Sequence, residues 1–442
     1  MSTKEPVVIE SKRLGKDQWL VLIAAFLGWG FDGLEQGLFP LVARPALQEL
    51  MPMAPEALVA QWVGYISAAF LIGAALGGLV FGWMGDKLGR VRSMAISILC
   101  YSLFTGCGYL VTAPWQLGVV RFCSAVGMGG EWALGVALVM ESWPEKLRPL
   151  MAGVIGAASN VGFLCIALLA VSYQVSIGSW RWMMLAGAAP AILGLLVIMF
   201  VPESQRWKQS VKTAVSNPFR EIFSRSLRKT TILAVVFASI PLIGTWAAVS
   251  GWTPVWADQL AGSQMPHAKG WVQVMIAIGA IIGCVAAPLI GGKIGRRPAY
   301  FGLCALSLLV CGHLFGVLRI FPAAWQEACP EWCVSLFGGL QHYDARFLAT
   351  CGVAGLFTAA FYGWLPLYLP ELFPTRVRAT GQGLSYNFGR ILAAAGALQM
   401  GQLVALLGGN YARAGATITL VYALGLVLIW LAPETKGKPL PD

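Results

Sequence analysis

Charged residues and histidines are scarce in this chain of 442 residues. Asp, Glu, Lys and Arg together make up 12% of it, about half of what an ordinary soluble domain carries. Its three histidines argue against a zinc site and against a histidine-dependent catalytic triad. No glycine-rich loop ends in Lys-Ser or Lys-Thr, which argues against ATP as the energy source. We therefore expect no enzymatic activity, no cofactor and no metal site.

Apolar residues, in contrast, dominate the composition. The chain is 57% hydrophobic, and its mean hydropathy is +0.70. A membrane-spanning helix needs about 20 apolar residues, and twelve stretches approach or exceed that length. They lie at about 18–42, 60–84, 93–112, 115–141, 150–173, 182–201, 231–257, 271–291, 298–318, 346–369, 383–406 and 416–432. The sequence thus predicts an all-α protein that crosses a lipid bilayer with twelve helices.

Positive charge is abundant and unevenly distributed. Lys and Arg number 31 against 20 Asp and Glu, a formal net charge of +11. If the N-terminus lies in the cytoplasm, 23 of these 31 residues fall on the cytoplasmic side and six on the other, as the positive-inside rule requires. We predict that both termini lie in the cytoplasm. No basic run is interleaved with aromatic residues, so we expect no nucleic-acid partner.

The chain also repeats itself. Residues 85–90 (GDKLGR) follow the second apolar stretch, and residues 291–296 (GGKIGR) follow the eighth. A repeat at this distance predicts two related halves. We expect an N-terminal six-helix bundle at 1–205, a cytoplasmic linker at 206–230 and a C-terminal six-helix bundle at 231–442.

Four motifs resemble those of the major facilitator superfamily. They are residues 82–90 with the pattern GxxxDKxGR, 202–207 (PESQRW), 370–381 (PELFPTRVRATG) and 433–437 (PETKG). On these motifs the chain is identified as a member of that superfamily. Membership implies two bundles related by a pseudo-twofold axis, with alternating access to a central cavity.

Two further segments indicate a branch of the superfamily. Residues 31–35 (FDGLE) and 127–132 (GMGGEW) resemble segments of the aromatic-acid and sialate-type proton symporters. Glu35 departs from that pattern because it replaces a second Asp, and Ala125 stands where those relatives often have Gly. The stretch 238–256 has no Gln, whereas sugar porters usually carry a Gln pair there.

Three acidic residues within the apolar stretches are candidates for proton coupling. Asp32 and Arg121 are expected at similar depth, so we predict that they pair, either as a proton switch operated by substrate on Arg121 or as a permanent ion pair. Glu35, one turn from Asp32, is either a second proton site or a residue near the outer interface. Glu131 is either a proton site or part of an inner-gate ion pair.

The candidate substrate-binding residues centre on Arg390, whose guanidinium suits a carboxylate. An arginine here resembles that of organic-acid symporters, so we expect an anionic substrate, unless Arg390 only pairs with an acid to stabilise a gate. The alternative explanation for the aromatic candidates is the membrane interface, and for the polar candidates it is helix packing. The further candidates are Arg121, Tyr386, Asn387, Asn160, Gln399, Trp246, Tyr362 and Trp364.

Charged residues near the cytoplasmic helix ends are predicted to form a gate that holds the outward-open state. These are Asp86, Arg90, Glu141, Arg148, Glu203, Arg296, Glu371, Arg378 and Glu434. Gly292 replaces the acid equivalent to Asp86, so we expect the second set of ties to be weaker.

These observations predict a proton-coupled symporter for a small organic acid anion of aromatic or sugar-acid type. The alternatives are a sugar or polyol proton symporter, an organic-cation or drug exporter of the same fold, and a transporter-like sensor. We expect a monomer, and the resemblance to bacterial symporters implies a bacterial inner membrane. Cys329 and Cys333 share an outer loop in which a disulfide is an open question.

Overall fold

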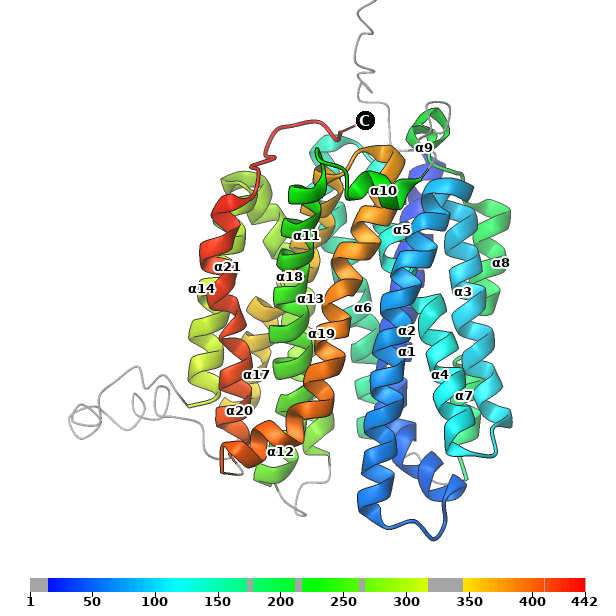
Figure 1. Cartoon of the computed structure of the whole chain (residues 1–442), viewed down its shortest axis with the longest axis vertical. Helices are drawn as coiled ribbons and strands as arrows, with labels where there is room; N and C mark the ends of the chain where they lie inside the picture. Colours follow the sequence, from blue (N-terminus) through cyan, green and yellow to red (C-terminus); the bar gives the residue numbers. More distant parts are fainter. Residues whose placement is uncertain are drawn as a thin grey trace, which may run out of the picture.

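The computed structural model describes residues 15–172, 178–210, 217–261, 267–316, 345–408 and 410–441. The described residues form helices, 3-10 turns and connecting segments, without a strand. The helices run roughly parallel to one another and form a bundle of two halves (Figure 1). This arrangement confirms the predicted all-α architecture.

The first half is formed by the helices up to residue 200. They are α1 (Lys16–Leu50), α2 (Glu56–Leu88), α3 (Arg90–Cys107), α4 (Pro114–Met128), α5 (Glu131–Ser142), α6 (Arg148–Ser172), α7 (Trp180–Ala186) and α8 (Ala191–Phe200). Two short helices follow, α9 (Gln205–Ser210) and α10 (Pro218–Ile222). They lie at the same end of the bundle as the C-terminus (Figure 1). We call this end the terminal face.

The second half begins with α11 and contains a π-helical segment. Its elements are α11 (Arg228–Pro241), η4 (Leu242–Ser250), α12 (Gly251–Ala261), α13 (Ala268–Ile294), α14 (Arg296–Leu314), α17 (Ala345–Thr358), α18 (Phe361–Leu372), α19 (Arg378–Leu406), α20 (Tyr411–Thr419) and α21 (Val421–Leu428). Pro241 ends α11, and the wider π turn follows it directly. Such π segments are often found at functional sites.

Ten helical stretches among the described residues are long and apolar enough to cross a membrane. Several combine consecutive elements, such as α4 with α5 and α17 with α18. The two remaining predicted spans are α1 and α19, which have 35 and 29 residues. Both carry buried polar groups, among them Asp32 in α1 and Arg390 in α19. Ionisable groups buried inside membrane helices, such as these two, are usually functional.

The internal repeat appears as the same local structure in both halves. Gly89 and Gly295 have φ values of 108° and 110°, a region that favours glycine. Glu203 accepts hydrogen bonds from the backbone N–H groups of Arg90 and Val91 at the start of α3. Glu434 does the same at the start of α14. The two halves thus reuse one device, an acid that binds a helix N-terminus.

The halves approach each other closely where α2 meets α19. A methyl group on Gly383 would come within 2.2 Å of the backbone oxygen of Gly78, so this contact requires glycine. Close approach through small residues is typical of helix packing in membranes. The contact brings α19 against the first half and positions Tyr386 and Arg390, one and two turns further along, at a cavity.

Candidate functional site

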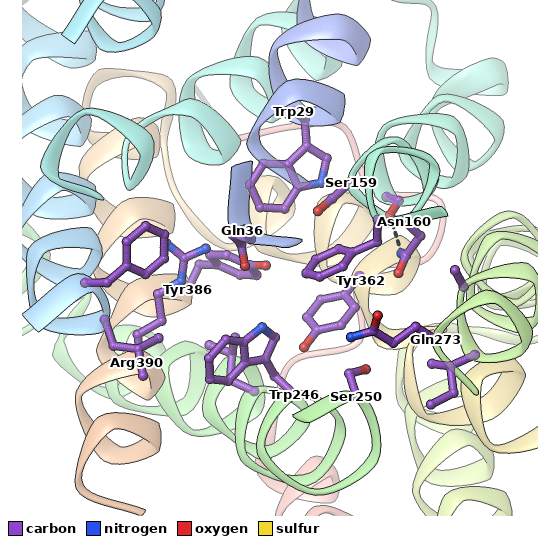
Figure 2. Close-up of a pocket in the computed structure, with 17 residues that line it drawn as sticks. Trp29, Gln36, Ser159, Asn160, Trp246, Ser250, Gln273, Tyr362, Tyr386 and Arg390 are labelled. Atoms are coloured by element: carbon purple, nitrogen blue, oxygen red, sulfur yellow. Dashed lines mark hydrogen bonds between the residues drawn. The ribbon is translucent and has the colours of Figure 1, made fainter. Parts of the chain in front are cut away.

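A cavity lies between the two halves (Figure 2). It contains about 890 Å³ of space not filled by atoms, including solvent at its mouth. Side chains from α1, α2, α6, η4, α13, α18 and α19 line it. Because both halves contribute to its wall, movement of one half against the other changes the cavity. This is the position expected for a transporter's substrate site.

Arg390 supplies the positive charge of this cavity. The residue is 5% exposed, and its Nη1 atom has no hydrogen-bond partner among the described residues. Its Cζ atom lies 5.5 Å from the centre of the Tyr386 ring. A buried guanidinium with an unused donor, stacked on an aromatic ring at a cavity wall, is suited to bind a carboxylate.

Tyr386 is itself held in place by aromatic contacts. It stacks on Trp132 with ring centres 4.0 Å apart and an interplanar angle of 13°. Trp29 and Tyr362 meet it edge-on, at 6.1 and 6.4 Å. The cavity is thus walled by aromatic rings from both halves.

Asp32 lies directly beside the cavity but inside the first half. It is fully buried, and its Oδ1 atom has no hydrogen-bond partner in the described part of the chain. Gln36, one turn further along α1, donates from Nε2 to Asp32 Oδ2 at 3.4 Å. Gln36 also lines the cavity, and Arg390 interacts electrostatically with Asp32. Asp32 is therefore linked to the cavity through Gln36 and Arg390.

The predicted pairing of Asp32 with Arg121 is wrong. Arg121 instead forms an ion pair with Glu35, through Nη1 and Oε1, and Thr105 donates a second hydrogen bond to Glu35 Oε1 at 2.8 Å. Glu35 lies about one turn further along α1 than Asp32, and its longer side chain reaches α3 and α4. Neither member of this pair lines the cavity.

Glu131 lies in the interior of the first half and does not join the gate. Its carboxyl packs against Gly28 of α1, where a methyl group would come within 2.0 Å of Oε1. Both of its carboxyl oxygens are buried without a hydrogen-bond partner among the described residues. The groups that face it include Ser97 and Asp32.

Five of the predicted substrate residues line the cavity, namely Arg390, Tyr386, Asn160, Trp246 and Tyr362. Two do not. Trp364 is fully buried within the second half and donates from Nε1 to the backbone oxygen of Arg296 at 3.1 Å. Asn387 is bonded to the backbone oxygens of Gly129 and Gly383, both at 3.0 Å. Each of these two side chains faces a helix contact. The Gln399 side chain and residues Cys329 and Cys333 lie outside the described part of the chain.

Bonds between charged groups join the two halves at the terminal face. Arg378 Nη1 lies 2.9 Å from Glu141 Oε1, and Arg90 Nη2 lies 3.1 Å from the same oxygen. Arg90 also donates to the backbone oxygen of Thr375 at 2.7 Å. Asp86 pairs with Arg90 at 2.8 Å and accepts hydrogen bonds from α19. Four predicted gate residues, Asp86, Arg90, Glu141 and Arg378, are therefore brought together across the interface.

Five other predicted gate residues make their closest contacts within one half. Arg148 pairs with the neighbouring Glu145 at 2.9 Å, and Arg296 pairs with Glu371 at 2.5 Å. The remaining two, Glu203 and Glu434, bind helix N-termini as described above.

Gly292 packs against Pro149 of the first half, where a methyl group would come within 3.1 Å. At this position the second half therefore makes a close packing contact, whereas the equivalent residue of the first half, Asp86, makes ionic and hydrogen-bonding contacts.

Several cavity residues were not predicted from the sequence. Trp29, Gln36, Ser159, Ser250 and Gln273 all line the cavity. Gln36 and Gln273 had a usable signal, because an amide within an apolar stretch needs a polar partner. Serines in apolar stretches carry no such signal, since they often bond to their own helix.

Comparison with known proteins agrees with this architecture. Residues 19–338 match the Major Facilitator Superfamily. The cis,cis-muconate transport protein of Acinetobacter baylyi is 28% identical over 396 residues, covering 87% of each chain. The sialic acid transporter NanX of Escherichia coli is 26% identical over 430 residues, covering 97% of this chain and 96% of its own. The solved structure of the proton:xylose symporter XylE has a TM-score of 0.75 at 18% identity, covering 96% and 98% of the two chains. As its motifs predicted, the chain belongs to the Major Facilitator Superfamily and is a multi-pass membrane transporter.

Proposed function

We propose that this protein is a proton-coupled symporter of a small organic acid anion, of aromatic or sugar-acid type. The observation that carries the proposal is the unused Nη1 donor of buried Arg390 at the wall of the cavity between the halves. A guanidinium desolvated in this way needs a negative partner. The relatives named for muconate and sialic acid transport support an organic acid as the substrate, with two carboxylates in muconate and one in sialic acid.

Proton coupling follows from the position of Asp32 relative to Arg390. Burial of Asp32 disfavours its ionised form, and the positive charge of Arg390 opposes this effect. A substrate carboxylate bound to Arg390 neutralises that field, so Asp32 then holds a proton more tightly. Binding of the anion and binding of the proton therefore reinforce each other, as thermodynamic linkage requires of a symporter.

The other two buried acids take different roles in this proposal. Glu35 already has a positive partner, Arg121, and serves chiefly to hold α1 against α4. Glu131 has neither a cation nor a hydrogen-bond partner among the described residues. Ionising a buried carboxyl without a counter-charge is costly, so Glu131 is the candidate for a second, inner proton site.

Alternating access is the proposed mode of transport. The bonds of Asp86, Arg90, Glu141 and Arg378 hold the halves together at the terminal face, which we assign to the cytoplasm because Lys and Arg concentrate there. Breaking these bonds lets the halves rock and opens the cavity inward. We place the protein in a bacterial inner membrane, as a monomer, with both termini in the cytoplasm.

Thermal unfolding of the purified protein with organic acids, neutral sugars and amines at two pH values tests the proposal. A ligand of the folded state raises the unfolding midpoint. We expect only acids to do so, and Arg390→Gln to abolish the effect, whereas Arg413→Gln, at an exposed position, retains it. Stabilisation by sugars or amines, or by acids equally in Arg390→Gln, contradicts the proposal.

A further inference from the structure

The side of the cavity away from Arg390 is lined by neutral polar groups. Asn160 of α6, Ser250 of η4 and Gln273 of α13 lie together there, across the cavity from Arg390 in Figure 2. We call these three residues the amide wall. Among the 17 residues drawn as lining the cavity, Arg390 is the single charged one. The cavity thus has one cationic wall and one neutral hydrogen-bonding wall.

The polar groups of the amide wall are available to a ligand. Neither Ser250 nor Gln273 has a side-chain hydrogen-bond partner among the described residues. Asn160 Nδ2 makes only long contacts of 3.5 Å, to the backbone oxygen of Gly156 and to Cys284 Sγ. All three side chains are partly buried. A ligand that supplies a matching hydrogen bond to such a group stabilises the complex.

Charge sets a second condition on the ligand. A carboxylate at Arg390 is neutralised by the guanidinium, but a second carboxylate at the amide wall meets no cation among the cavity-lining residues. Moving an ion out of water without a counter-charge is strongly unfavourable. An amide or hydroxyl wall instead binds hydroxyl, carbonyl or amide groups, which it recognises with high selectivity.

Resting on the proposed function, we infer that the substrate is a monocarboxylate with a neutral hydrogen-bonding group at its far end. Its carboxylate binds Arg390, and its neutral oxygen or nitrogen binds the amide wall, chiefly Gln273. Dicarboxylates are bound more weakly. Gln273 and Ser250 are then the residues that determine specificity, while Arg390 supplies the requirement for an anion.

Titration calorimetry with matched acids tests this inference. The probes are benzoate, 4-hydroxybenzoate and the dianion terephthalate, together with hexanoate and 6-hydroxyhexanoate as an aliphatic pair. We expect at least one hydroxylated acid to bind about three- to tenfold more tightly than its partner, the contribution of one hydrogen bond. Terephthalate should bind more weakly than 4-hydroxybenzoate.

Substitution of the amide wall gives the decisive comparison. In Gln273→Leu we expect the preference for the hydroxylated acid to disappear while the affinity for its unhydroxylated partner stays within about twofold. Gln61→Leu, which changes an exposed glutamine of α2, should retain the preference. If Gln273→Leu unfolds at a lower temperature than wild type, Ser250→Ala provides the same comparison with a smaller change.

The outcomes separate this inference from the proposed function. If unhydroxylated acids bind and need Arg390, but the hydroxyl adds nothing or terephthalate binds best, the amide-wall inference is wrong and the anion symporter stands. If no acid binds in wild type, the proposed function and this inference fail together. Retention of the hydroxyl preference in both Gln273→Leu and Ser250→Ala also overturns the inference.

Discussion

Asp86 of α2 accepts two hydrogen bonds from Thr380 of α19, one from the backbone N–H at 2.8 Å and one from the hydroxyl at 2.6 Å. The neighbouring N–H of Ala379 donates to the other carboxyl oxygen at 3.2 Å. All these groups are buried. One carboxylate of the first half therefore binds the N-terminus of a helix in the second half, where the helix dipole favours negative charge.

The substitution Asp86→Asn should loosen this contact. A hydrogen bond to a charged group contributes about 1.5–3 kcal/mol, so we expect the amide hydrogens of Ala379 and Thr380 to exchange about ten- to hundredfold faster. Hydrogen exchange measured by mass spectrometry on peptides covering the start of α19 checks this. Glu145→Gln is the matched control, because it breaks an ion pair confined to the first half. Equal exchange in Asp86→Asn and wild type would show that the contact does not hold the halves together.

The Glu35–Arg121 pair gives a prediction about stability. Removing one member of a buried pair leaves an uncompensated charge, at a cost of about 3–5 kcal/mol. Arg121 also lies over the rings of Phe39 and Phe70, at 5.0 and 4.6 Å. We expect Arg121→Leu to lower the free energy of unfolding by an amount in that range, measured by denaturant titration in detergent.

A double substitution separates the charge from the packing. Adding Glu35→Gln to Arg121→Leu removes the unpaired charge, so much of the lost stability should return. If the double variant is as unstable as the sum of the two single variants, the two residues are not coupled.

The sequence predicted the architecture well because apolar length and repeated motifs are local features. The pairing of Arg121 with Glu35 was missed because it depends on how α1 is rotated about its axis. Asp32 and Glu35 are separated by less than one helical turn, so their depths in the membrane are similar. Depth along a helix can be counted from the sequence, but side-chain direction cannot. The direction of Trp364 could not be predicted for the same reason, since Tyr362, two residues away, faces the cavity while Trp364 faces α14.

The polar wall of the cavity could not be assembled from the sequence. Asn160, Ser250 and Gln273 belong to three helices that are far apart in the chain. Their proximity depends on how the two halves pack and on the π turn that ends at Ser250. A single chain carries no local pattern that predicts such a meeting.

The geometry of Arg390 leads to a prediction about its conservative replacement. A lysine keeps the positive charge but lacks the planar fork and the stacking surface that the guanidinium offers to Tyr386. We expect Arg390→Lys to weaken acid binding at least tenfold without a large change in the unfolding midpoint. Calorimetric titration with benzoate and gluconate measures the loss. Wild-type affinity for both acids in Arg390→Lys would mean that charge alone recruits the anion.

Glu203 and Glu434 should respond to pH with opposite signs. Burial raises the pKa of Glu203 and outweighs its backbone hydrogen bonds. Burial would also raise the pKa of Glu434, but four backbone N–H donors hold this pKa below the usual value of 4.5. Glu434 therefore contributes stability above about pH 4.5 that is lost as the pH falls, whereas the contribution of Glu203 is present at low pH and lost as the pH rises.

Substitution by glutamine separates the two effects. Glu434→Gln should lower the unfolding midpoint more at pH 7.5 than at pH 4, and Glu203→Gln should do so more at pH 4 than at pH 7.5. Midpoints at several pH values between these limits provide the comparison. The same pH trend in both variants would be incompatible with these assignments.

The most direct test of the central claim is uptake into proteoliposomes under an imposed proton gradient. The probe is the radiolabelled acid that raises the unfolding midpoint most. We expect wild type to accumulate it only when the outside is more acidic, and Asp32→Asn to lose this accumulation while still exchanging labelled for unlabelled acid. Asp17→Asn, at an exposed position of α1, should behave as wild type. Accumulation that ignores the gradient in wild type, or that persists in Asp32→Asn, would contradict the account.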